Sequence, residues 1–191
     1  MAWDSTMIKE GKTIAERVHI VYSRFTNGDT KDGTKYSLGG LYVRKVTSYV
    51  SRNALENILR VFPDALVYDD NNRRIGIEYQ KVTPESCGVT REHMIPVAEA
   101  YQYFSILHRE GRLTEETIKA FMPKLHIAFI KVDENRKFKD VHLTKKMPPN
   151  WWNSPALDPL DRYRAAGLGD DMWEMDFLND DLSPRWREER M

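Results

Sequence analysis

The residues with the clearest capacity for chemistry are two acids and an amide around a predicted hairpin, namely Asp64, Glu78 and Gln80. Side chains alternate along a strand, so Glu78 and Gln80 share one face while Lys81 points to the other. If the two strands pair, Asp64 at the start of the first comes near Glu78 on its neighbour. Two carboxylates placed in this way hold Mg²⁺, which prefers oxygen ligands. A metal so held activates water and offsets the charge of a phosphodiester.

The elements that must position these residues are a helix and the hairpin itself. Ser51 is a typical N-cap, and the apolar residues behind it recur at helical spacing up to Pro63. Two short apolar runs follow, at residues 65 to 68 and 75 to 82. Between them lie the turn-forming residues 69 to 73, a pattern that predicts a β-hairpin.

The rest of the chain predicts further helices and strands around this unit. A helix is favoured over residues 6 to 17, although residues 14 to 25 also fit a strand. We expect a glycine-rich loop at 26 to 40, a strand at 41 to 50, helices at 92 to 110 and 113 to 121, a buried strand at 125 to 132 and its hairpin partner at 138 to 146. This order predicts a mixed α/β (α+β) fold with a central mixed sheet flanked by helices.

Together, these residues resemble a known enzyme superfamily. An Asp after a Pro, a hairpin, and a Glu-x-Gln at the end of its second strand look like the PD-(D/E)XK nucleases, over residues 51 to 132. The resemblance implies a restriction-endonuclease-like core and a Mg²⁺ or Mn²⁺ site. Asp64 and Glu78 would be metal ligands, Glu56 on the preceding helix a further acid, and Gln80 would take the position usually filled by Lys.

This last position departs from the family pattern. Gln80 lacks the charge with which the usual Lys polarises the attacking water, although some restriction endonucleases of the superfamily have Gln there. Lys81 is adjacent but on the opposite face, and it substitutes only if the strand bulges. A purely structural interpretation also stands. In it, Asp64 ends a helix and opens a strand, and Glu78 and Gln80 form the solvent face of an edge strand.

Basic residues gather in sequence around the same unit. A phosphate backbone would be attracted by such a field, and nearby tyrosines offer faces on which bases stack. An ordinary charged surface is an equally good interpretation. The residues expected to bind nucleic acid, DNA rather than RNA, are Arg44, Lys45, Arg52, Arg73 and Arg74.

Charge and composition divide the chain in two. Of 29 basic and 29 acidic residues, 24 basic and 19 acidic ones precede position 151, while 5 basic and 10 acidic ones follow it. We therefore expect a compact domain at 1 to 147 and an extended, acidic C-terminal tail at 148 to 191. The tail contains four tryptophans, which is unusual for disorder. They are expected to dock on the body or on a protein partner.

Composition also excludes some classes of protein. The N-terminus has no apolar stretch typical of a signal peptide, and no apolar run approaches the length of a membrane span. Cys87 is the only cysteine, so the fold needs no oxidising compartment. These features predict a cytoplasmic protein without a membrane partner. The expected function is a Mg²⁺-dependent nuclease or nuclease-like DNA-processing protein, with a non-catalytic nucleic-acid-binding module or a protein-assembly module as alternatives.

Overall fold

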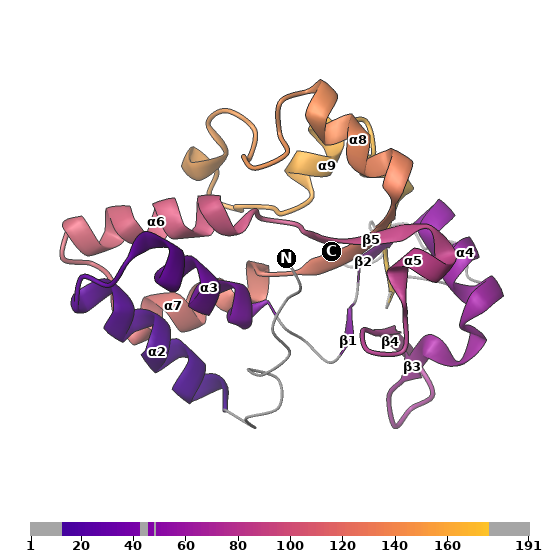
Figure 1. The fold of residues 1–191 in the computed structure, drawn as a ribbon, viewed down its shortest axis with the longest axis horizontal. Coiled ribbons are helices and arrows are strands. Elements are labelled where there is room, and N and C mark those ends of the chain that lie inside the picture. Colours follow the sequence, from indigo (N-terminus) through magenta and orange to yellow (C-terminus); the bar gives the residue numbers. More distant parts are fainter. Residues whose placement is uncertain (1–12, 43–45, 48, 176–191) are drawn as a thin grey trace.

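The computed structural model describes residues 13–42, 46–47 and 49–175, and within them the chain has a mixed α/β fold (Figure 1). The larger sheet has the order β5-β6-β2-β7, in which only β2 and β6 are parallel. A smaller antiparallel sheet has the order β1-β4-β3. The strands are β1 (Val46–Thr47), β2 (Tyr49–Ser51), β3 (Leu66–Tyr68), β4 (Arg74–Glu78), β5 (Val89–His93), β6 (Ile127–Lys131) and β7 (Met172–Glu174). The expected central mixed sheet flanked by helices is confirmed, whereas a restriction-endonuclease-like core stays a prediction.

Helices cover both faces of the larger sheet. The helices are α2 (Ile14–Thr26), α3 (Lys31–Leu41), α4 (Arg52–Val61), α5 (Pro84–Cys87), α6 (Val97–Arg109), α7 (Glu115–Phe121), α8 (Val132–Asp140) and α9 (Asp161–Ala165). Phe129 of β6 points to the face that packs against α4 and the β3–β4 hairpin. Its neighbours Ala128 and Ile130 point to the other face, toward α8 and α9. Because side chains alternate along β6, this one buried strand contributes residues to two separate cores. Among the described residues, none of the helices is long and apolar enough to cross a bilayer.

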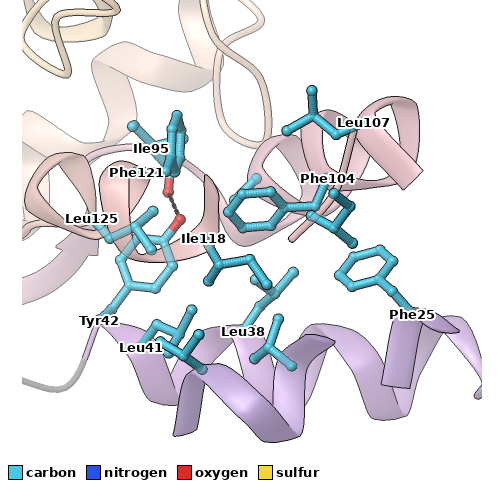
Figure 2. Packing of buried hydrophobic residues seen from close by; sticks show 14 of the residues in the cluster. Phe25, Leu38, Leu41, Tyr42, Ile95, Phe104, Leu107, Ile118, Phe121 and Leu125 are labelled. Atoms are coloured by element: carbon cyan, nitrogen blue, oxygen red, sulfur yellow. Dashed lines mark hydrogen bonds between the residues drawn. The ribbon is translucent and has the colours of Figure 1, made fainter. Parts of the chain in front are cut away.

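A third core lies at one end of the molecule, where α2, α3, α6 and α7 pack together (Figure 1). Its centre is a set of buried aliphatic and aromatic side chains, shown in Figure 2. Tyr42 lies at the end of α3, and its hydroxyl donates a hydrogen bond of 2.7 Å to the carbonyl oxygen of Ile95. Because the ring is fully buried, this bond satisfies a hydroxyl that would otherwise be costly to desolvate. It ties α3 to the segment between β5 and α6.

One helix replaces the loop expected at residues 26 to 40. The glycines in this segment suggest a turn, but α3 forms because Thr30 caps it, accepting a hydrogen bond from the Gly33 amide. Thr34, Leu38 and Leu41 then follow at helical spacing and are all buried. Tertiary burial therefore overrides the weak helix propensity of glycine. The strand expected at 41 to 50 is present only in part. Leu41 belongs to α3, and the strands described in this range, β1 and β2, belong to different sheets.

The helix expected at 92 to 110 is confirmed except at its start, whereas the strand expected at 138 to 146 is wrong in type. The helix expected from position 92 begins only at Val97, after Pro96, and residues 89 to 93 form strand β5 instead. Proline favours extended backbone before it, which explains the boundary. The strand expected at 138 to 146 is in part the helix α8. Glu134 accepts the Lys131 amide at 2.8 Å, which starts the helix, and Phe138 is fully buried on its inner face.

The segment expected to be a tail packs on the body as far as it is described. Trp151 belongs to the core between α2, α3, α6 and α7, and Trp152 stacks on Tyr103 with ring centroids 4.9 Å apart. Trp173 lies in β7, which pairs with β2 and packs against the α4 core. The described tryptophans therefore dock on the chain itself, and residues 148 to 175 are part of the fold. Trp186 lies outside the described residues.

A buried carboxylate joins three of these elements. Glu134 is 5% exposed, and its oxygens accept hydrogen bonds from Ser51 Oγ at 2.5 Å and Asn53 Nδ2 at 2.8 Å. Ser51 Oγ also accepts the Ala54 amide, so it caps α4 as the sequence predicts. Strand β6, helix α8 and the first turn of α4 thus meet at the buried Glu134 carboxylate, whose oxygens accept hydrogen bonds from these elements.

Substitution Ser51→Ala should therefore cost about 2 kcal/mol of unfolding free energy, more than an ordinary cap, because it removes a donor to a buried carboxylate as well. Urea denaturation measures the change. Ser86→Ala is the matched control, since Ser86 is exposed, and we expect it to be neutral. Equal stability of the two variants would contradict this account of Glu134.

Candidate functional site

The proposed site lies where the β3–β4 hairpin meets α4. After α4 the chain makes one 3₁₀ turn, η1 (Pro63–Ala65), and then enters β3. Strand β4 runs back antiparallel, with Leu66 opposite Ile77, and ends at Glu78. The expected hairpin is thus confirmed. Asp64 lies in the 3₁₀ turn and is exposed, and Glu78 is half-buried at the strand end, so both carboxylates are open to solvent.

Lys81 links the Glu78 carboxylate to the backbone of the 3₁₀ turn that contains Asp64. Its ammonium lies 3.1 Å from Glu78 Oε2 and donates a hydrogen bond of 3.1 Å to the backbone carbonyl oxygen of Asp64. Strand alternation predicts that Lys81 points away from Glu78, and this is wrong. The strand stops at Glu78, and a turn closed by the Lys81 amide and the Glu78 carbonyl follows, at 3.1 Å. The turn returns the lysine to the side of the acid.

Arg91 of β5 holds this turn in place. Its guanidinium donates hydrogen bonds to the carbonyl oxygens of Tyr79 at 3.0 Å and Val82 at 2.7 Å. The guanidinium carbon also lies 4.0 Å from the centroid of the Tyr79 ring, a cation–π contact. The planar donor fork suits two carbonyls at once. Nothing local in the sequence marks this internal role of Arg91, because the role depends on β5 being a strand.

Two of the expected site residues are not joined to this pair. Gln80 is exposed in the turn, and among the described residues no hydrogen bond links it to Asp64 or Glu78. Glu56 is exposed on α4 and pairs with Arg52 at 3.7 Å. Within the described part of the chain, no three His, Cys, Asp or Glu side chains are grouped closely enough to hold a metal ion. Glu56 therefore does not complete a three-acid site.

The expected phosphate-binding residues have varied surroundings. Arg73 is paired with Asp69 of the same hairpin loop at 2.7 Å, and Arg74 is buried. Arg52 is exposed, pairs weakly with Glu56, and lies 5.8 Å from the centroid of the Trp173 ring. Arg44 and Lys45 lie outside the described residues. Of the described members, Arg52 and Arg73 are thus exposed and each pairs with an acid, whereas Arg74 is buried.

The arrangement offers a defined set of chemical groups around the start of β3 and the end of β4. It contains two solvent-accessible carboxylates and, between the turn and the strand end, one ammonium group in contact with both segments. Carboxylates supply hard oxygen ligands, and the lysine supplies a compact, strongly hydrated charge. Comparison of the chain with family models, with curated proteins and with solved structures finds no match. Function must therefore be argued from these groups.

Proposed function

We propose that this protein is a metal-dependent phosphodiesterase acting on nucleic acid, a nuclease or a nuclease-like DNA-processing protein, with its centre at Asp64, Glu78 and Lys81. The observation that carries the proposal is the position of Lys81, whose ammonium touches both the Glu78 carboxylate and the Asp64 backbone. Acids and a lysine at the end of a hairpin are also what the resemblance to PD-(D/E)XK nucleases implies. In this chain we assign the role of that lysine to Lys81 and not to Gln80.

The donor set fits Mg²⁺ or Mn²⁺. These ions accept carboxylate oxygens, and Mg²⁺ keeps several of its own waters, so that two protein carboxylates and a substrate phosphate can suffice. Asp64 and Glu78 would hold the ion, and when bound it would supply Lewis acidity at the phosphodiester. Lys81 would orient a water molecule and balance negative charge that develops on the phosphate. Arg91 is a positioning residue, because it holds the turn that carries Lys81.

The test is cleavage of supercoiled plasmid and of single-stranded DNA with Mg²⁺ or Mn²⁺. We expect metal-dependent cleavage by the wild type, and its loss in Asp64→Asn, Glu78→Gln and Lys81→Gln, since each removes a group of the proposed centre. Asp70→Asn is the matched control, because Asp70 is an exposed acid in the loop of the same hairpin. Equal cleavage by all variants, or no cleavage by the wild type with either ion, would refute the proposal.

A non-catalytic nucleic-acid-binding module is the second candidate. It is favoured by the lack of a third acid beside Asp64 and Glu78 among the described residues. Titration of DNA at several salt concentrations without metal ions distinguishes the two. When phosphate contacts drive binding, the logarithm of the binding constant falls linearly with the logarithm of the salt concentration. Salt-dependent binding without turnover in the presence of Mg²⁺ would support this candidate over the first.

A further inference from the structure

Two lysines share one tyrosine ring on the surface formed by α3 and α6. The ammonium groups of Lys31 and Lys35 each lie 5.8 Å from the centroid of the Tyr101 ring. They are four positions apart on α3, so they lie on the same face of that helix. Lys31 is exposed, and Lys35 and Tyr101 are half-buried. The result is a small surface in which two cations and an aromatic ring are side by side.

The Tyr101 ring is held in place by aromatic packing, whereas the two lysine side chains are flexible. Phe25 stacks on Tyr101 with centroids 5.4 Å apart, and Phe25 in turn contacts the buried ring of Phe104 in the core shown in Figure 2. Tyr101 is thus packed against the core formed by α2, α3, α6 and α7. The lysine side chains reach it from α3 through flexible stems. They can leave the ring at little cost, since an exposed cation–π contact is weak.

The two ammonium groups form no ion pair within the described part of the chain. Among the residues that the structure describes, no carboxylate is paired with Lys31 or Lys35. The neighbouring acid Asp29 is already bound to Arg24 at 3.0 Å. Asp32, in the first turn of α3, is exposed and forms no ion pair with either lysine among the described residues. Two like charges near one ring repel each other, and an anion placed between them would relieve that repulsion. Lys31 also begins α3, where the partial positive charge of the helix N-terminus adds to the field.

We propose that this surface, defined by Lys31, Lys35 and Tyr101, binds a single-stranded nucleic acid. A base stacks on the Tyr101 ring by displacing the lysines from it, and the displaced ammonium groups then pair with phosphates of the same strand. A ring flanked by cations is the combination that single-strand-binding surfaces use. The choice of nucleic acid as the ligand rests on the proposed function, whereas the surface itself follows from the contacts.

The location of this surface sets a minimum length for a strand that reaches the proposed site. The four-helix end that carries α3 and α6 lies opposite the end with α4 and the β3–β4 hairpin (Figure 1). A strand held at Lys31 and Lys35 must therefore extend across the molecule to reach Asp64 and Glu78. The surface would act as an anchor, remote from the proposed chemistry, and would be expected to favour long strands over short ones.

Fluorescence anisotropy with a labelled oligothymidylate, in EDTA and at several salt concentrations, tests the anchor without any cleavage. In the double variant Lys31→Gln/Lys35→Gln, we expect weaker binding and a slope of log affinity against log salt that is smaller by about 1.4, the value for two lost phosphate contacts on a single strand. The matched control is Lys137→Gln/Lys139→Gln, which removes two exposed lysines from α8. The control should keep the wild-type slope.

The stacking step has its own test. Tyr101→Leu should weaken oligothymidylate binding about tenfold but leave an abasic strand of the same length unaffected, because only the former offers a base to the ring. Tyr101→Phe keeps the ring and should keep the affinity, which guards against a folding defect. The proposal is overturned if the lysine variant has the wild-type slope, if the wild type binds no strand at low salt, or if a polyglutamate peptide binds as well as the oligonucleotide.

These outcomes are separable from those for the proposed function. Asp64→Asn should lose cleavage and still bind the strand with the wild-type salt dependence, since Asp64 is not part of the anchor. Conversely, a lysine variant that binds poorly retains Asp64, Glu78 and Lys81, so its cleavage should recover at high substrate concentration. Cleavage without any effect of Lys31 and Lys35 on binding would retain the nuclease and remove the anchor.

Discussion

Substitution Arg162→Met should destabilise the protein by about 3 to 5 kcal/mol, because it leaves the half-buried Glu92 carboxylate without its partner. Arg162 of α9 is fully buried and pairs with Glu92 Oε1 at 2.8 Å. Its guanidinium carbon lies 4.1 Å from the centroid of the Phe138 ring. The remaining donors bond the carbonyl oxygens of His93, Leu143 and Thr144 at 2.9 to 3.0 Å. One side chain thus joins β5, α8 and α9, and urea denaturation measures the loss.

The control for this prediction is Arg164→Met, two positions along the same helix. Arg164 pairs with Asp158 and Asp161, but its side chain is 46% exposed, so we expect a change of at most about 1 kcal/mol. The double variant Arg162→Met/Glu92→Leu should recover much of the stability, since it removes the stranded charge. If Arg162→Met were no more harmful than Arg164→Met, the buried pair would not hold these elements together.

The sign of the pH effect gives a second check on the same pair. Burial raises the pKa of Glu92, and the charge of Arg162 partly opposes that rise. A carboxyl whose pKa is higher in the folded state loses stabilising influence as pH rises past its ordinary value of 4.5. Without Arg162 the pKa of Glu92 should rise further. The destabilisation of Arg162→Met should therefore be larger near neutral pH than in mild acid.

Local signals predict the unit around the site well. Ser51 caps α4, Pro63 follows its end, and the residues between β3 and β4 form a tight loop in which Asp69 Oδ1 accepts the amides of Asn71 and Arg73. Each of these features involves neighbours in sequence, so spacing and residue type reveal it. The backbone positions of Asp64, just before β3, and of Glu78, at the end of β4, follow from the same local signals.

The features that the sequence does not predict depend on contacts between residues far apart in the chain. The glycine-rich segment becomes α3 because its apolar face is buried against α2 and α6, and β5 forms because β6 pairs with it. The role of Lys81 is missed because nothing local marks the strand end at Glu78. The internal use of Arg91 and Arg162 is hidden as well. From the sequence alone, a charged residue is expected at the surface, and only the fold shows which carbonyl oxygens surround it.

In mild acid, stability should depend strongly on the titration of His93. Its pKa is lowered from the ordinary value of 6.5 to about 4, mainly by burial and further by the charge of Arg162. The unfolded chain takes up a proton below pH 6.5, whereas the folded protein does so only near pH 4. Stability that is complete above pH 6.5 is therefore lost as pH falls toward 4, by about 3 kcal/mol. Denaturation by urea across this range measures it.

The contribution of His93 is isolated by comparison with His93→Gln, which cannot titrate. The advantage of the wild type over this variant should shrink by about 3 kcal/mol between pH 7 and pH 4. Glu92 titrates in the opposite sense in both proteins, so the difference cancels it. A His93→Gln difference that stays flat across this range would show that His93 does not remain neutral in the folded protein.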